Sequence, residues 1–406
     1  MKLLILSQYF PPETGAPQNR LYELATKLKA LGVNVTVLTA MPNYPKMEIF
    51  DEYKGKNYHF EMIDDIPVHR TRIFVSEKKS ILHRLLNYFS FTLSSYLKGR
   101  KFDDFDFILC NSPPLFLGYT AIALSKKLNA KLIFNVSDLW PESAEKLGIV
   151  TNKRLLKLAY SLEEKCYQHA ELVTGQTQGI VSDIKNRFPH KDVYWLPNGA
   201  NLNVLNPDNV NAEGSFRQKH KIDKDDLVFF YGGIHGHAQG LDLIIHAAAK
   251  ITNPKIKFVL LGDGPLKSEL LKLKNKYNVS NIIFADPVAK SDIPQIISEI
   301  DISLVPLKNL PLFKGAIPSK IFEILAMEKP ILLGVDGEAK ELFIKEGNAG
   351  WFYEPENLEM LVKQINWIAS NSNEVIQKGK NGREYVTRNF DRQRIAESFF
   401  GKISSL

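Results

Sequence analysis

The second half of the chain contains the run Phe230-Tyr231-Gly232-Gly233-Ile234-His235-Gly236-His237-Ala238-Gln239-Gly240-Leu241-Asp242. An apolar segment, Val228–Tyr231, leads into this run, and the helical pattern Leu241–Ile251 follows it. Four glycines within nine residues directly after a strand allow backbone N–H groups to converge on a phosphate. The spacing matches neither the P-loop nor the dinucleotide-binding GxGxxG motif. We therefore predict an anion-binding loop between a strand and a helix. A metal held by His235 and His237 is the alternative, but it lacks a visible third ligand.

The same order of elements repeats along the whole chain. Short apolar runs alternate with helical patterns, which is typical of parallel sheets covered by helices on both faces. The predicted strands are Leu3–Leu6, Val33–Leu38, Val68–Phe74, Phe107–Leu109, Lys131–Val136, Leu172–Thr174, Val228–Tyr231, Lys257–Leu261, Ile282–Ala285, Ile302–Val305 and Pro330–Leu333. We predict an α/β protein with two tandem Rossmann-like, doubly wound domains facing each other across a cleft.

A Pro- and Asn-rich stretch, 188–207, separates the two halves. We expect an N-terminal domain over residues 1–188, a C-terminal domain over 189–390, and a last helix within 391–406. This helix could pack on either domain, and one alternative is that it crosses back to the N-terminal domain. Ligands of such sheets bind at the carboxyl ends of the strands, so the strand-to-helix loops are where chemistry is expected.

Composition excludes several classes of protein. The chain has 406 residues, of which 44% are hydrophobic and 24% charged, so disordered, collagen-like and coiled-coil proteins are excluded. Two cysteines, Cys110 and Cys166, cannot form a disulfide framework, which favours a reducing, cytoplasmic environment. No apolar segment reaches the length of a membrane-spanning helix. The net charge of +7 is uneven, because residues 1–190 carry 25 basic and 19 acidic side chains while residues 191–406 carry 27 and 26. An anionic partner of the first half is one interpretation, and an ordinary basic surface is the other.

Two loops of the first half are candidates for a site. The predicted first strand ends at Ser7, and the loop after it contains Gly15, which permits close backbone approach, and Pro17, which suits a first helical turn. The strand Lys131–Val136 is followed by Asp138, which could contact a sugar or orient a nucleophile. A helix cap is an equally good interpretation of Asp138.

A third loop follows the predicted strand Ile302–Val305. Pro318 indicates the start of a helix, so Ser319 and Lys320 would face an anion bound at its first turn. Glu323 lies one turn further on the same face, and its carboxylate suits the hydroxyls of a ribose. In isolation, an exposed i,i+3 pair would be the usual interpretation of Lys320 and Glu323.

These residues resemble a known family over essentially the whole chain, the retaining family-4 glycosyltransferases of the GT-B fold. The first loop is similar to the family's glycine loop, and Pro197-Asn198-Gly199-Ala200-Asn201 resembles its interdomain motif. Leu261-Gly262-Asp263-Gly264-Pro265 is similar to its G-x-G-P turn, and Pro318-Ser319-Lys320 through Glu323 resembles the helix that carries its donor-binding glutamate. Ala238-Gln239-Gly240-Leu241-Asp242 is most similar to the bacterial surface-polysaccharide enzymes that transfer an amino sugar such as N-acetyl-L-fucosamine.

The resemblance implies transfer of a sugar, with retained anomeric configuration, from a nucleoside diphosphate donor to an acceptor held by the first domain. It implies a UDP-linked donor as co-substrate, no cofactor, a polyprenyl-diphosphate-linked saccharide as acceptor, and no nucleic acid partner. The implied donor-binding residues are Gly232, Gly233, His235, Gln239, Ser319, Lys320 and Glu323. The implied catalytic residues, at the transferred sugar and acceptor, are Asp138 and Gly15.

The chain departs from the family pattern at three positions. Gly315 stands where the first glutamate of the Glu-x7-Glu pair is expected, Gln239 replaces the lysine of the phosphate loop, and Ser137 stands where many relatives have histidine. The first two changes place more of the diphosphate charge on Lys320. The third weakens the inference about Asp138.

We predict that the enzyme needs no metal. Two DxD strings occur, Asp104-Phe105-Asp106 and Asp223-Lys224-Asp225, and such a string could hold Mg²⁺ against a diphosphate. Both, however, precede a predicted strand and so lie at the amino edge of a sheet, away from the expected ligand.

A membrane surface is the anionic partner that we predict for the first half. Residues 78–102 contain no acidic side chain and combine Lys78, Lys79, Arg84, Lys98 and other basic residues with many leucines and aromatics. An amphipathic helix of this kind can lie on an anionic bilayer. We expect a peripheral protein on the inner face of the plasma membrane, and packing of the helix in the core is the alternative.

Two other functions are compatible with the sequence. One is a GT-B nucleotide-sugar 2-epimerase, which turns over its donor without an acceptor. The other is a non-catalytic subunit that binds a sugar nucleotide, suggested by Gly315 and Gln239.

Overall fold

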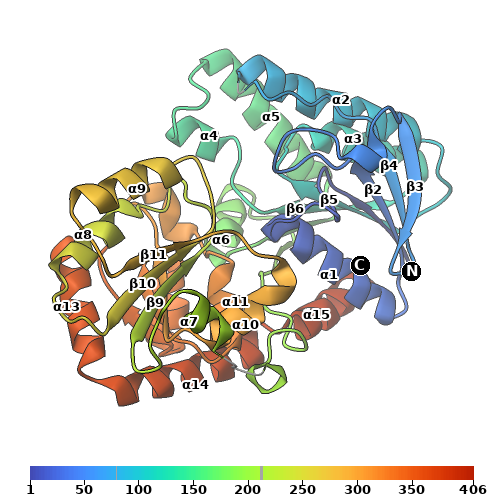
Figure 1. The fold of residues 1–406 in the computed structure, drawn as a ribbon. Coiled ribbons are helices and arrows are strands. Elements are labelled where there is room, and N and C mark those ends of the chain that lie inside the picture. The colour runs from blue at the N-terminus through green and yellow to red at the C-terminus, as the bar shows by residue number, and fades with distance from the viewer. Residues whose placement is uncertain (79, 211–213) are drawn as a thin grey trace. The chain divides into compact units, whose positions relative to one another are not determined.

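The computed structural model describes residues 1–78, 80–210 and 214–406, which form two compact units (Figure 1). The first unit holds Met1–Asn198 together with Arg392–Leu406, and the second holds Gly199–Asp391. The first unit continues past residue 188 because a short strand, β8 (Val193–Trp195), pairs with β7 and completes the first sheet. Lys79 lies outside the described residues.

The first unit contains an eight-stranded sheet in the order β3-β4-β2-β1-β5-β6-β7-β8. Its strands are β1 (Lys2–Leu6), β2 (Asn34–Ala40), β3 (Tyr58–Ile63), β4 (Ile66–Thr71), β5 (Phe107–Ser112), β6 (Lys131–Val136), β7 (Leu172–Gly175) and β8. All pairs are parallel except β3 with β4, which form an antiparallel hairpin. Central strands are buried on both faces, as continuous apolar runs predict.

Helices cover both faces of this sheet (Figure 1). They are α1 (Ala16–Ala30), α2 (Ile81–Gly99), α3 (Leu117–Leu128), α4 (Glu142–Lys146), α5 (Lys153–His169), α6 (Gln178–Arg187) and α15 (Arg392–Ser404). Because side chains alternate along a strand, Leu4 and Leu6 pack in the cluster with α2, α3, α5 and α6, whereas Leu3 and Ile5 pack with α1 and α15.

The last helix, α15, belongs to the first unit. Its Ala396, Phe399 and Ile403 are buried in the cluster that covers α1 and the sheet. The Arg392 guanidinium forms an ion pair with Glu23 of α1 at 2.6 Å. The C-terminal helix thereby packs against α1 and helps to cover one face of the first sheet.

The second unit contains a six-stranded parallel sheet in the order β11-β10-β9-β12-β13-β14. Its strands are β9 (Leu227–Gly232), β10 (Ile256–Leu261), β11 (Ile282–Ala285), β12 (Ile302–Pro306), β13 (Ile331–Gly334) and β14 (Gly350–Phe352). The strands that follow β9 in the chain lie first on one side of it and then on the other. The reversal between β9 and β12 is a topological switch point, where open α/β sheets bind ligands.

Helices also surround the second sheet (Figure 1). They are α7 (Ser215–Lys219), α8 (Asp242–Lys250), α9 (Lys267–Lys276), α10 (Ile293–Ser298), α11 (Lys320–Ala326), α12 (Glu338–Lys340), α13 (Leu358–Ala369) and α14 (Ser372–Asn389). Helices α8, α9 and α13 share one apolar cluster with the sheet. Phe322 of α11 packs on Phe343 and Phe390 in a second, aromatic cluster.

The two Rossmann-like sheets confirm the predicted fold class, but three strands had been missed. Strand β3 alternates partly buried with exposed residues and includes exposed Phe60 and Met62, so it lacks the continuous apolar run used to find the others. Strands β8 and β14 have three residues each, too few for a pattern to emerge. In the part of the chain that the structure describes, no helix is long and apolar enough to cross a membrane.

Candidate functional site

The loop after β9 and the turn after β10 are joined by backbone contacts. The N–H of Gly233 donates to the carbonyl oxygen of Leu261 at 3.0 Å, and the N–H of His235 donates to that of Asp263 at 2.8 Å. A Cβ on Gly262 would lie 2.0 Å from the carbonyl oxygen of Gly233, and one on Gly264 would lie 2.5 Å from that of His235. Both glycines also have positive φ angles, 137° and 159°. Only glycine therefore fits this close approach.

His235 is buried beneath the loop. Its side chain is fully enclosed, and neither ring nitrogen has a hydrogen-bond partner among the described residues. Burial lowers the pKa of His235, and Lys267 lowers it further, so the ring is neutral near pH 7. The neighbouring His237 is exposed on the surface. The two histidines therefore differ in environment, and the sequence could not distinguish them.

Lys320 lies at the switch point of the second sheet. Its ammonium nitrogen is 3.7 Å from the centroid of the Tyr231 ring, a cation–π contact between the first residue of α11 and strand β9. The same nitrogen lies 3.0 Å from the position that a Cβ on Gly233 would occupy. Burial lowers the pKa of Lys320 to about 7, and the Glu323 carboxylate partly opposes this effect. A cation that is poorly solvated in this way gains from a bound anion.

Ser319 and Glu323 belong to the first turn of α11. Ser319 occupies the N-cap position, and its side chain makes no capping hydrogen bond. Glu323 is partly buried and lies within electrostatic range of Lys320. The helix begins at Lys320, two residues later than the Pro318 start that the sequence predicted. Helix α11 thus presents a hydroxyl, a cation and a carboxylate along one short segment.

Gln239 lies further along the loop after β9. Its amide oxygen is 2.8 Å from the position of a Cβ on Gly236, so the side chain folds back over its own loop. The N–H of Lys308 donates to the carbonyl oxygen of Ala238 at 2.9 Å, which joins this loop to the segment after β12. Gly315 lies in open space, with no atom within 4 Å of its would-be Cβ.

In the first unit, Gly15 caps helix α1 at the end of a loop organised by a buried carboxylate. Glu13 accepts the backbone N–H groups of Asn43 at 2.8 Å, Tyr44 at 2.9 Å and Phe10 at 3.3 Å. Burial raises the pKa of Glu13, and these three donors oppose the rise. The buried Arg70 also donates to the carbonyl oxygen of Pro11. Glu13 was not predicted from the sequence, in which its position between Pro12 and Gly15 is the only signal.

Asp138 follows β6, and its carboxylate accepts the hydroxyl of Ser143 at 2.5 Å. Ser143 lies in the first turn of α4, but the N-cap of that helix is Pro141 and no side chain makes a capping hydrogen bond there, so the helix-cap interpretation of Asp138 was wrong. Asp138 is nevertheless exposed, and a carboxylate can accept further hydrogen bonds. Asp138 and Gly15 follow β6 and β1, which are separated by β5 at the carboxyl edge of the same sheet.

A buried polar network that the sequence did not reveal lies under this edge. The Arg20 guanidinium of α1 donates to Asn135 Oδ1 at 3.1 Å and to the carbonyl oxygen of Leu196 at 3.0 Å. Asn135 in turn donates to Asn111 at 2.6 Å. Burial and the nearby Arg392 lower the pKa of Arg20 to about 10, which leaves it charged at neutral pH. Arg20 is therefore a fixed positive charge beneath the loop that carries Asp138.

The DxD strings lie where the sequence predicted. Asp104 pairs with the Lys2 ammonium at 3.3 Å, and Asp106 accepts the Lys2 N–H at 2.7 Å, at the amino edge of the first sheet. Asp223 lies ahead of β9 in the turn closed by Asp226. Among residues 1–78, 80–210 and 214–406, no group of three His, Cys, Asp or Glu side chains is arranged to hold a metal ion. Metal independence stays a prediction.

Comparison with known families accounts for both units. Residues 15–199 match a glycosyl transferase 4-like domain, and residues 213–385 match the glycosyl transferases group 1. The chain belongs to the group 1/family 4 glycosyltransferases. It is 24% identical to a putative colanic acid biosynthesis glycosyl transferase of Escherichia coli strain K12, over 99% of this chain and 100% of that one.

Solved structures share the fold of this glycosyltransferase. Sucrose-phosphate synthase from Thermosynechococcus elongatus matches with a TM-score of 0.76 at 17% identity, over 100% of this chain and 98% of that one. Anabaena HepE, solved in complex with UDP and glucose, matches with a TM-score of 0.74 at 17% identity over 100% of both chains. At such identities the comparison supports the GT-B fold alone.

The contact at Gly262 generates a prediction about stability. Gly262→Ala places a methyl group against the Gly233 carbonyl, so we expect the free energy of unfolding to fall by roughly 2–3 kcal/mol in urea denaturation. Gly315→Ala is the matched control, because its methyl group meets no neighbour, and it should change stability by less than about 0.5 kcal/mol. Equal effects of the two substitutions would contradict the close approach.

Proposed function

We propose that this glycosyltransferase moves a sugar from a nucleoside diphosphate donor to a lipid-linked saccharide during the biosynthesis of a bacterial surface polysaccharide. The main support for binding of the donor is the position of the Lys320 ammonium, which lies beside Gly233 at the switch point of the second sheet. A depressed lysine pKa favours an anionic ligand there. The lipid-linked acceptor, a polyprenyl-diphosphate saccharide, rests on the family resemblance and on the colanic acid relative.

In this proposal, the residues around Lys320 bind different parts of the nucleotide. Gly232 and Gly233, which have no side chains, allow the diphosphate to approach the backbone closely. Lys320 supplies a positive charge to it, with Ser319 beside it. Glu323 accepts the ribose hydroxyls, a role that suits a carboxylate one turn away from the cation. His235 and Gln239 belong to the same loop and complete the proposed donor-binding set. The donor is a co-substrate, and no cofactor is proposed. UDP is our choice of nucleotide, supported by the UDP complex of a structural neighbour.

For the transferred group we propose an amino sugar of the N-acetyl-L-fucosamine type, which rests on the similarity of the Ala238–Asp242 segment to enzymes with that specificity. Asp138 and Gly15 would meet the sugar and acceptor in the first unit. Transfer would proceed with retention and without a metal, as the acceptor attacks from the face that the diphosphate leaves. The phosphate oxygen then takes the acceptor proton, so no second carboxylate is required.

Transfer can be tested with purified full-length protein, radiolabelled UDP-sugars and an organic extract of bacterial lipid-linked saccharides. We expect label to enter the organic phase. Glu323→Gln should lower kcat/KM by roughly tenfold or more, because it weakens a charge-assisted hydrogen bond. The exposed Glu359→Gln is the matched control and should behave as wild type. Donor isomerised without an acceptor would identify an epimerase, and donor bound but unchanged would identify a non-catalytic subunit; either result overturns the proposal.

The pKa of Lys320 predicts a pH dependence of nucleotide binding. Its folded-state pKa of about 7 lies below that of an ordinary lysine, so the free site loses its charge as pH rises through 7. Between about pH 7.5 and 8.5 the nucleotide phosphates no longer titrate. UDP affinity in calorimetry should therefore fall there by a factor approaching tenfold, with proton uptake on binding. Lys320→Arg keeps its charge and should remove the slope. An unchanged slope in that variant would refute the prediction.

We also propose that the protein is peripheral on the cytoplasmic face of the membrane, held by α2 and the segment before it. Replacing Lys78, Lys79 and Arg84 with Gln should weaken sedimentation with phosphatidylglycerol vesicles by roughly a hundredfold, since each basic residue contributes about 1 kcal/mol. The control replaces Lys250, Lys272 and Lys380, three exposed lysines of the second unit. No sedimentation of wild type, or equal losses in both triple variants, would rule the proposal out.

A further inference from the structure

Helix α2 exposes a continuous apolar row. Leu82, Leu86, Phe89, Leu93 and Leu97 follow one another at spacings of three or four residues, which places them on one side of the helix. Leu82 is 64% exposed and Leu93 is 60% exposed. The opposite side of α2 is buried in the core through Phe91 and Ser95. Large exposed apolar patches on soluble proteins usually mark an interaction site.

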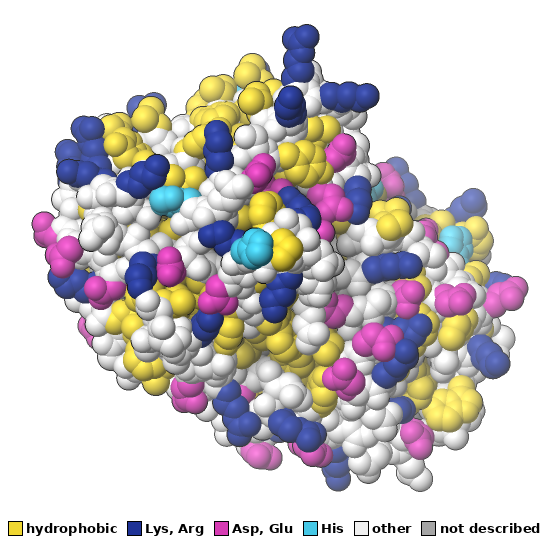
Figure 2. Space-filling view, turned by 180° about the vertical axis from the view of Figure 1, so that it is seen from behind, with side chains coloured by type: hydrophobic (Ala, Val, Ile, Leu, Met, Phe, Trp, Pro, Cys, Tyr) yellow, Lys and Arg dark blue, Asp and Glu magenta, His cyan; other side chains and the backbone are white. Residues whose placement is uncertain are grey.

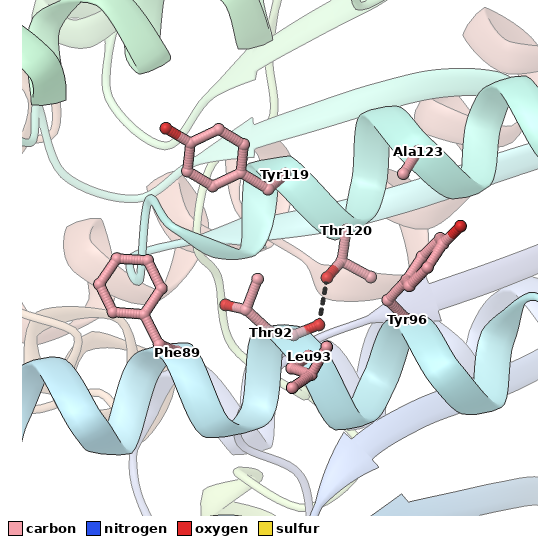
Figure 3. Close-up of a pocket in the computed structure, with 7 residues that line it drawn as sticks. All are labelled: Phe89, Thr92, Leu93, Tyr96, Tyr119, Thr120 and Ala123. Carbon is pink, nitrogen blue, oxygen red and sulfur yellow. Dashed lines mark hydrogen bonds between the residues drawn. The ribbon is translucent and has the colours of Figure 1, made fainter.

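A groove runs between this row and helix α3 (Figure 3). Phe89, Leu93 and Tyr96 line it from α2, and Tyr119 and Ala123 line it from α3. Its volume is about 490 Å³, in the range of small-molecule sites. The hydroxyl of Thr120, which also lines the groove, donates to the carbonyl oxygen of Thr92 at 2.6 Å, so both of these polar atoms have a partner within the protein. The groove therefore suits a hydrocarbon ligand.

Positive charge surrounds the apolar row. Arg84 lies on the first turns of α2, Arg100 and Lys101 follow its end, and Lys126 and Lys127 lie in the last turn of α3, all of them exposed. Figure 2 shows Lys and Arg side chains beside a gathering of hydrophobic side chains at the top of the view. Between Lys78 and Phe102 the chain has no acidic residue. An apolar groove with basic flanks fits an anionic lipid.

Aromatic contacts connect the groove to the carboxyl edge of the first sheet. The centroids of the Phe89 and Phe116 rings are 4.7 Å apart, and those of the Phe116 and Trp140 rings are 5.6 Å apart. Trp140 lies two residues after Asp138 in the chain. Along α2, Asn87 Oδ1 accepts a hydrogen bond from Gln8 Nε2 at 2.9 Å, in the loop after β1. One end of the groove therefore lies next to the loops where the proposed function puts the acceptor.

We propose that the α2–α3 groove binds the polyisoprenyl chain of the lipid-linked acceptor and directs its phosphate end toward the loop of Asp138. This inference rests on the proposed function for the identity of the lipid. A bulk phospholipid would not require the aromatic connection to the Asp138 loop. A second copy of the chain would bring two patches that both contain Arg84, Arg100 and Lys101 together, since a two-fold contact joins the same surface of both copies. The basic residues and the position of the groove thus both favour the polyisoprenyl chain over a bulk phospholipid or a second copy of the protein.

The proposal is tested by native mass spectrometry of the full-length protein with undecaprenyl phosphate in detergent. Wild type should retain one equivalent of the lipid. Ala123→Trp fills the groove and should weaken retention at least about tenfold. Leu93→Gln, at a 60% exposed position where folding is not at risk, should weaken it in the same direction. Leu158→Gln is the matched control, since Leu158 is 66% exposed on α5 and lies outside the groove.

Four results would overturn the inference. The first is a wild type that does not retain undecaprenyl phosphate, and the second is retention by Leu93→Gln and Ala123→Trp equal to that of wild type. The third is retention of dioleoylphosphatidylglycerol equal to that of undecaprenyl phosphate, and the fourth is a lipid-free dimer that Leu93→Gln dissociates. The rise in Tm of wild type with UDP reports separately on the second unit. If UDP stabilises the protein and its donor is turned over while undecaprenyl phosphate is not retained, chain binding fails and the transfer function stands. If the lipid is retained without any donor turnover, the proposed function fails instead.

Discussion

The close backbone approach of Gly262 and Gly264 to Gly233 and His235 is the constraint on which the donor side depends. It lets two loops from neighbouring strands share backbone hydrogen bonds, so the glycine loop is held by β10 as well as by β9. Because Gly233 has no side chain, the Lys320 ammonium can approach it and stack on Tyr231. A Cβ at any of these glycines would push apart the loop after β9, the turn after β10 and Lys320.

The same arrangement explains how a nearly neutral half of the chain could attract a diphosphate. Residues 191–406 have a charge balance of only +1, so a broad positive field is not available. The attraction is local instead, since one poorly solvated lysine gains more from an anion than an exposed lysine does. Gln239, further along the same loop, carries no charge.

The basic residues of the first unit occur in two different environments. Arg20 is buried and serves the polar network beneath the β6 loop, whereas the basic residues around α2 and α3 are exposed and flank an apolar face. Burial of one cation inside a hydrogen-bond network stabilises loop positions. Exposed cations beside leucines are available to an anionic surface or lipid head group.

The sequence alone determined the two α/β units, most of their strands, the strand-to-helix loops and the resemblance to family-4 glycosyltransferases. It could do so because buried parallel strands are continuous apolar runs, and because glycines and prolines mark turns directly. Only the tertiary structure separated buried His235 from exposed His237, and only it revealed that Glu13 and Arg20 are buried ionisable side chains. Only it paired Asp138 with Ser143, added β3, β8 and β14, and showed that α2 and α3 form an apolar groove. These features depend on which residues distant in sequence become neighbours, and local patterns carry no information about such neighbours.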